Sequence, residues 1–222
     1  MDYTPFTKWV LDNGLSERTL ELLVGIAIVA TIVSLARYLF GSKSFGIYAP
    51  VILAVAFTYT GLRYGLVITA IVIVSSLLSY LILSKIRMHY ISRMAINYCL
   101  IIMSLIIFFI IVHKYNLGLP NMSLIQPLAI ISIIGLSDFF AKQQIKKGFK
   151  TSILVLGSTL VIASIGWFII TREAISTFMI NNLWLIPALI VINILIGQFS
   201  GLRFKDIVRF RTLIQDKENV KK

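Results

Sequence analysis

Residues 45–65 read FGIYAPVILAVAFTYTGLRYG, and residues 122–148 read MSLIQPLAIISIIGLSDFFAKQQIKKG. Each contains a short apolar segment, Phe45–Gly61 and Met122–Ser137, with a proline near its start and a glycine after it. The paired positions are Pro50 with Pro127 and Gly65 with Gly148. We interpret this match as an internal repeat whose second copy has a longer loop.

Five longer apolar runs surround these two segments: Thr19–Phe40, Tyr64–Ser84, Ile91–Val112, Phe149–Ile170 and Phe178–Gly197. A helix needs about 20 apolar residues to cross a bilayer. The composition agrees, since 58% of the residues are hydrophobic, 14% are charged and the mean hydropathy is +0.92. We therefore predict an all-α integral membrane protein with seven transmembrane helices in residues 19–197. The two short segments are either full crossings, which we favour, or re-entrant hairpins.

The repeat predicts where a site lies. Two units of three helices must point in opposite directions across the membrane, and short segments interrupted by Pro or Gly at matching positions of inverted halves mark the binding region in such proteins. The candidate binding or conduit residues are Pro50, Thr58, Tyr59, Thr60, Gly61, Pro127 and Asp138.

Basic residues predict the orientation. The chain has 21 Lys and Arg against 9 Asp and Glu, a net charge of +12. With seven crossings, 16 of the 21 basic residues fall on one side, which the positive-inside rule makes cytoplasmic. We expect residues 1–18 outside, a retained first helix without a cleaved signal, and a cytoplasmic tail at 198–222. Because the charges lie in short loops, they predict contacts with lipid headgroups and no nucleic-acid binding.

The tail and the loops predict a basic surface. Phe204, Ile207 and Val208 recur at helical spacing, which indicates a basic amphipathic helix on the inner leaflet or against a protein partner. The candidate partner surface comprises Arg87, Lys142, Lys146, Lys147, Arg209 and Arg211.

Residues with catalytic chemistry are sparse. His89 and His113 lie in loops on opposite sides, so they cannot share a metal, and the single Cys99 lies in an apolar run and cannot form an intramolecular disulfide. We predict a protein that is not an enzyme and has no metal or cofactor. We place Asp138 at the end of the second short helix, paired with Lys142 or Lys146. No carboxylate is then expected in mid-span, which argues against ion-driven transport.

Residues 41–66 and 197–213 resemble the seven-helix bacterial membrane domain that is often fused to an inactive transglutaminase-like domain. The likeness runs from about Leu22 to Leu213. Residues 134–148 are also similar to the small membrane C subunit of poly-gamma-glutamate (capsule) synthesis, and Asp138 stands where the first family has an acidic residue.

The resemblance implies a non-catalytic prokaryotic plasma-membrane subunit. Its partners would be a cytoplasmic ATP-grasp or Mur-ligase-like amide ligase and an anionic, glutamate-type peptide polymer that this ligase makes or exports. These 222 residues contain no transglutaminase-like domain. Recruitment is therefore expected to use another chain or the basic loops and tail.

Two other functions remain open from sequence. One is a stand-alone small-molecule transporter with its site between the two short helices, and the other is a lipid-binding structural protein. The sequence gives no oligomeric state. Asn97 and Asn193, which lie inside spans, are expected to form interhelical hydrogen bonds.

Overall fold

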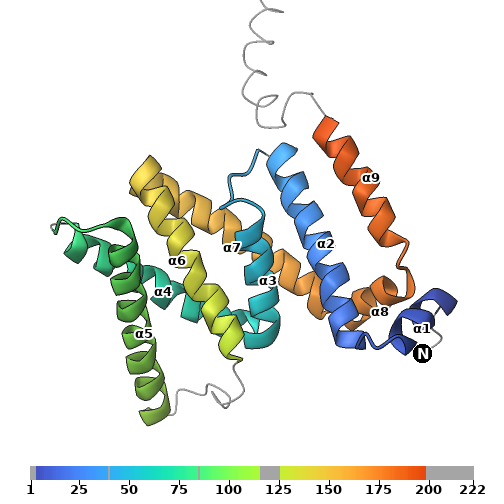
Figure 1. The fold of residues 1–222 in the computed structure, drawn as a ribbon, viewed down its shortest axis with the longest axis horizontal. Helices are drawn as coiled ribbons and strands as arrows, with labels where there is room; N and C mark the ends of the chain where they lie inside the picture. The colour runs from blue at the N-terminus through green and yellow to red at the C-terminus, as the bar shows by residue number, and fades with distance from the viewer. Residues whose placement is uncertain (1–3, 40, 85, 116–125, 199–222) are drawn as a thin grey trace, which may run out of the picture.

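The computed structural model describes residues 4–39, 41–84, 86–115 and 126–198, which form helices and no strands (Figure 1). In chain order the helices are α1 (Pro5–Asp12), α2 (Glu17–Tyr38), α3 (Tyr48–Thr60), α4 (Leu62–Leu83), α5 (Tyr90–Lys114), α6 (Pro127–Lys147), α7 (Phe149–Thr171), α8 (Glu173–Asn181) and α9 (Leu185–Gln198). The predicted tail, including Arg209 and Arg211, lies outside the described residues.

The helices are those of an integral membrane protein. Among the described residues, α2, α4, α5, α6 and α7 are long and apolar enough to cross a membrane, and α8 with α9 makes a sixth candidate if the bent pair is one span. In lipid a helix satisfies all of its backbone hydrogen bonds internally, which explains why apolar runs of this length are helical. The predicted all-α membrane class is confirmed. The short helix α3 has 13 residues.

The second short segment, predicted to end at Ser137, forms a longer helix than expected. Its helix, α6, has 21 residues and continues through Lys142 to Lys147 before Gly148 ends it. Ala, Lys and Gln are strong helix formers, so the helix does not stop where the apolar run stops. Asp138 therefore lies inside α6, and its placement at a helix end was wrong.

The last predicted span, Phe178–Gly197, is not one continuous helix. It divides into α8 and α9, which meet at 96°. Pro187 is the third residue of α9, and proline is tolerated only in the first turn of a helix because it lacks an N–H and clashes with the preceding turn. A new helix must therefore start near Leu185. The N-terminal helix α1, capped by the Thr4 side chain, was not predicted.

Helices α2–α4 and helices α5–α7 share one plan. Gly61 joins α3 directly to α4 with φ 77°, and Gly148 joins α6 directly to α7 with φ 78°. The N–H of Gly61 donates to the carbonyl of Phe57, and the N–H of Gly148 donates to the carbonyl of Gln144. Each glycine carbonyl in turn accepts from the N–H of the residue four positions later. Gly61 is therefore the structural counterpart of Gly148, where the sequence match had used Gly65.

The packing repeats with the same symmetry. The first half (α2–α4) and the second half (α5–α7) pack against each other in matching pairs, with α2, α3 and α4 corresponding to α5, α6 and α7. Helices α2 and α3 both pack on α7, and their counterparts α5 and α6 both pack on α4. The two central helices, α3 and α6, pack on each other. In Figure 1, α2, α4 and α6 run toward the upper end and α3, α5 and α7 run away from it. Corresponding helices therefore point in opposite directions, as an inverted repeat requires.

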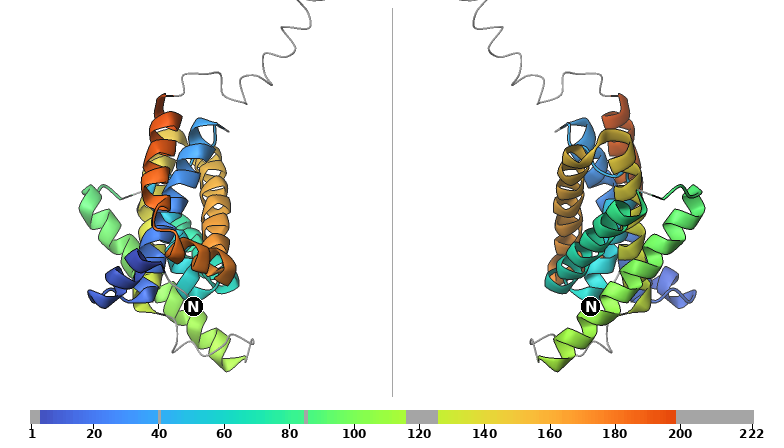
Figure 2. Two further views of the ribbon diagram at one scale, coloured as in Figure 1. Left: turned by 90° about the vertical axis from the view of Figure 1, so that its right-hand side faces the viewer. Right: turned by 90° about the vertical axis from the view of Figure 1, so that its left-hand side faces the viewer.

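The seventh segment breaks this symmetry. Helix α9 lies alongside α2, and α8 packs on α2 and α7, whereas α5 crosses the far side of the bundle (Figure 2). Asn193 of α9 donates to Thr31 of α2 at 2.8 Å, the interhelical bond expected of it. Many side chains of α5, including Ile102, Ile106 and Ile110, and the lone Cys99 are exposed, as suits a lipid-facing surface.

Candidate functional site

A basic cavity opens at the end of the bundle where α2 and α6 finish. It measures about 530 Å³, within the usual range for ligand sites. Five of its lining residues are cationic and none is acidic: Arg37, Lys43, Lys142, Lys146 and Lys147. We call this space the basic cavity. The remaining lining residues are Gly41, Ser42, Ser44, Phe45, Gly46, Phe139, Gln143 and Val155.

The connection between α2 and α3 forms one wall of the basic cavity and is fixed to α7. The N–H of Phe45 donates to the hydroxyl of Thr159 at 3.1 Å, and the hydroxyl of Ser158 donates to the carbonyl of Lys43. The Phe45 ring packs edge-on against Phe140, with centroids 6.5 Å apart. The backbone that carries Lys43 is therefore anchored to α7.

The other wall is the last part of α6. Lys142 and Lys146 are four residues apart and share one face of the helix, where like charges repel by a few tenths of a kcal/mol. Lys146 and Lys147 lie in the last turn, where the helix dipole favours positive charge. A bound anion would remove the repulsion, so this arrangement favours anionic ligands such as carboxylates or phosphates.

The sequence identified part of this cavity. Of the residues proposed for a basic partner surface, Lys142, Lys146 and Lys147 line this one cavity, whereas Arg87 is exposed in the α4–α5 connection and does not line it. Arg37 and Lys43 were missed as site residues. Their only signal was that their loop falls on the same predicted side as the α6 lysines.

The predicted conduit residues do not line the basic cavity. Pro50 is buried in the first turn of α3, and Thr58 and Thr60 donate to backbone carbonyls of their own helix. Tyr59 lies under the Arg18 guanidinium, 5.9 Å from ring centroid to Cζ. Gly61 is the α3–α4 joint described above, and Pro127 is exposed at the start of α6.

Asp138 has a different partner from the one predicted. The hydroxyl of Tyr98 on α5 donates to Asp138 Oδ2 at 2.7 Å, and neither Lys142 nor Lys146 forms an ion pair with it. The lysines are exposed and belong to the basic cavity. The expected lysine partner was therefore wrong.

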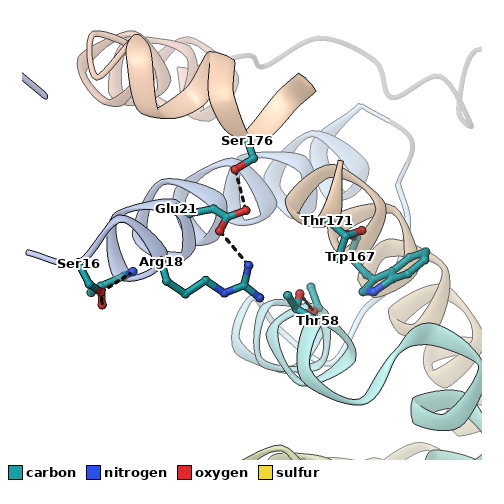
Figure 3. Close-up of polar contacts among 9 residues, drawn as sticks. Ser16, Arg18, Glu21, Thr58, Trp167, Thr171 and Ser176 are labelled. Atoms are coloured by element: carbon teal, nitrogen blue, oxygen red, sulfur yellow. Dashed lines mark hydrogen bonds and ion pairs between the residues drawn. The ribbon is translucent and has the colours of Figure 1, made fainter. Parts of the chain in front are cut away.

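A second cavity, of about 970 Å³, lies at the opposite end of the bundle. Glu21 lines it and accepts from Arg18 at 2.9 Å and from Ser176 at 2.6 Å, so α2 is tied to α8 (Figure 3). Glu17 and Glu173 also line it. Within the described ranges, no group of three His, Cys, Asp or Glu residues is placed to hold a metal ion.

Comparison with known proteins gives one family. Residues 14–214 match the family described as seven transmembrane helices usually fused to an inactive transglutaminase. No curated protein and no solved structure matches the chain. The match covers nearly the whole sequence and agrees with the apolar helices. The chain therefore belongs to this family of seven-helix membrane domains.

Proposed function

We propose that this protein is the non-catalytic membrane subunit of an assembly in which a cytoplasmic amide ligase makes or exports a glutamate-type peptide polymer. The observation that carries the proposal is the basic cavity, which gathers five cationic side chains and no carboxylate. A polymer with a carboxylate on every residue supplies the charges that such a cavity attracts.

The orientation follows from the charges. The basic end of the bundle faces the cytoplasm of a prokaryotic plasma membrane, since cytoplasmic loops carry the excess of Lys and Arg. The N-terminus is then outside and residue 198 is inside. The basic cavity is thus on the side where an ATP-dependent ligase of the ATP-grasp or Mur type would release its product.

The direct test measures polymer binding to the purified chain in lipid nanodiscs. We expect poly-γ-glutamate to bind, with an affinity that falls as salt rises. The variant Lys142→Gln/Lys146→Gln/Lys147→Gln should bind about 10- to 100-fold more weakly, if each charge contributes about 0.5–1 kcal/mol.

The matched control neutralises basic residues at the opposite end of the bundle. Arg63 and Lys114 are exposed there, near the start of α4 and at the end of α5. Arg63→Gln/Lys114→Gln should bind the polymer as the wild type does. Equal binding by the triple variant and the wild type would contradict the proposal. A reporter on the C-terminus checks that each variant keeps its orientation.

The assembly itself is tested by copurification. The chain is tagged at its C-terminus, native membranes are dissolved in mild detergent, and proteins that elute with it are identified by mass spectrometry. A ligase in stoichiometric amount supports the proposed subunit. Its absence after crosslinking of intact membranes, where detergent cannot dissociate it, would argue for a protein that acts alone.

The inverted repeat favours one second candidate, a stand-alone small-molecule transporter. In such proteins the substrate site lies between the two inverted halves, and here α3 and α6 of the two halves pack on each other. Purified protein in liposomes would then move a solute without any soluble partner. Flux assays on liposomes with and without the chain distinguish the two candidates.

A further inference from the structure

A layer of polar side chains lies between α5 and α6, apart from the basic cavity. Asn97 and Tyr98 are consecutive on α5, and Ser137 and Asp138 are consecutive on α6. Tyr98 donates to Asp138 at 2.7 Å, and the Asn97 amide donates to Ser137 at 3.5 Å. Asp138 is the twelfth of the 21 residues of α6, so the layer lies well inside a helix that is apolar enough to cross the membrane.

Two oxygens in this layer are buried and lack a hydrogen-bond donor within the described part of the chain. They are Oδ1 of Asn97, whose residue is 5% exposed, and Oδ1 of Asp138. An unpaired polar atom away from water costs several kcal/mol in hydrocarbon. Since both atoms are acceptors and one belongs to a carboxylate, the layer needs a donor or a positive charge.

The nearby cationic side chains do not meet this need. Arg93 is one turn from Asn97, and its Nη2 donates to the Ile86 carbonyl at 3.4 Å, toward the α4–α5 connection. Its Nε is buried and also lacks a partner. Lys142, one turn after Asp138, is exposed. Within the described ranges the carboxylate of Asp138 has no ion pair.

We propose that Asp138 and Asn97 bind a small monovalent metal cation between α5 and α6. The two unpaired oxygens are its principal ligands, and the hydroxyl oxygens of Tyr98 and Ser137 adjoin them. A carboxylate within a membrane-spanning helix is costly unless it is paired, and intramembrane carboxylates mark ion pathways. The site is independent of the polymer-binding proposal, because none of its four residues lines the basic cavity.

The test uses the purified full chain in nanodiscs and Na⁺ as the probe. Equilibrium binding of radioactive sodium is measured against choline chloride of equal ionic strength. We expect saturable binding, weakened about tenfold or more in Asp138→Asn and in Asn97→Leu. Ser132→Ala is the control, because within the described part of the chain that hydroxyl bonds only the Leu128 carbonyl of its own helix. Unchanged elution on size exclusion identifies the variants that remain folded.

Arg93→Gln separates a cation site from an ion pair between Arg93 and Asp138. If Asp138 binds Na⁺, the wild type binds it and Arg93→Gln binds it at least as tightly. If Asp138 instead pairs with Arg93, the wild type binds no Na⁺ and Arg93→Gln loses thermal stability in every salt. The proposal fails if sodium binding by the wild type does not rise above the background measured with choline chloride. It also fails if folded Asp138→Asn binds sodium with the affinity of the wild type.

Discussion

The first half (α2–α4) and the second half (α5–α7) follow one plan, yet α3 has 13 residues and α6 has 21. The longer helix α6 carries Lys142, Lys146 and Lys147, which form one wall of the basic cavity. The first half supplies the other wall through Arg37 and Lys43. The comparison teaches that the candidate site arises where the two halves differ, while the shared features, the glycine joints and exchanged contacts, hold the bundle together.

The largest expected effect comes from breaking the contact between the halves. Gly166 of α7 faces α2 and α3, and a Cβ there would lie 2.8 Å from a Val29 side-chain carbon and 2.9 Å from the Ala54 Cβ. Gly166→Leu should lower the free energy of unfolding by about 3 kcal/mol, because a tightly packed contact cannot accept the added volume. Denaturation in detergent micelles measures the loss.

Gly157 provides the control on the same helix. A Cβ at Gly157 has no neighbour within 4 Å. Gly157→Leu should change stability by less than about 0.5 kcal/mol. If both variants lower the free energy of unfolding equally, the close approach of α7 to the first half does not explain the loss.

The two joints should respond alike if the halves are true counterparts. Gly61 and Gly148 have φ of 77° and 78° with ψ of 147° and 170°, a region almost confined to glycine. Replacement of either by alanine should cost about 1–3 kcal/mol, measured by the same denaturation. Gly135→Ala, within α6 and without close neighbours, should be neutral or slightly stabilising. A loss of stability in only one of the two alanine variants would argue against Gly61 and Gly148 as structural counterparts.

The basic cavity should depend on both halves. Neutralising two residues of the first half, in Arg37→Gln/Lys43→Gln, and two of the second, in Lys142→Gln/Lys146→Gln, should each weaken polyanion binding about 5- to 30-fold. Titration of nanodiscs with labelled poly-γ-glutamate measures both. An effect confined to the second half would mean that the α6 lysines act as a simple surface patch.

The smallest effect tests α9, which packs on α2. Asn193→Leu removes the bond from α9 to Thr31, worth about 0.6 kcal/mol in a membrane protein. The Thr31 hydroxyl also donates to the Ala27 carbonyl and stays partnered. A double-mutant cycle with Thr31→Val should recover that coupling. Zero coupling would show that packing alone holds α9 in place.

Sequence patterns predicted the fold where apolar length decides it and failed where local backbone chemistry decides it. The five long runs became α2, α4, α5, α7 and, after a break, α9. The end of α6 was missed because a helix of good formers continues past its apolar part to Gly148. The 96° bend before α9 was missed because a long apolar run conceals the constraint that Pro187 imposes.

The candidate site was predictable only in part for a related reason. Loop charges identify which residues share a side of the membrane, and three lysines of the basic cavity were named on that ground. Membership of a cavity also depends on tertiary contacts, here those of Ser158 and Thr159 with the α2–α3 connection. Nothing in the sequence pairs residues 43–45 with 158–159, so Arg37 and Lys43 were overlooked.

The antiparallel packing of the halves has a consequence for ancestry. A separate three-helix polypeptide of this kind would complete such a bundle only by meeting a copy inserted the other way up, so two opposite insertions would have to occur in equal numbers. Fusion of two copies into one gene fixes that ratio at one to one. Fusion also frees each copy to diverge, and the lengthened α6 with its lysines is what such divergence would leave behind.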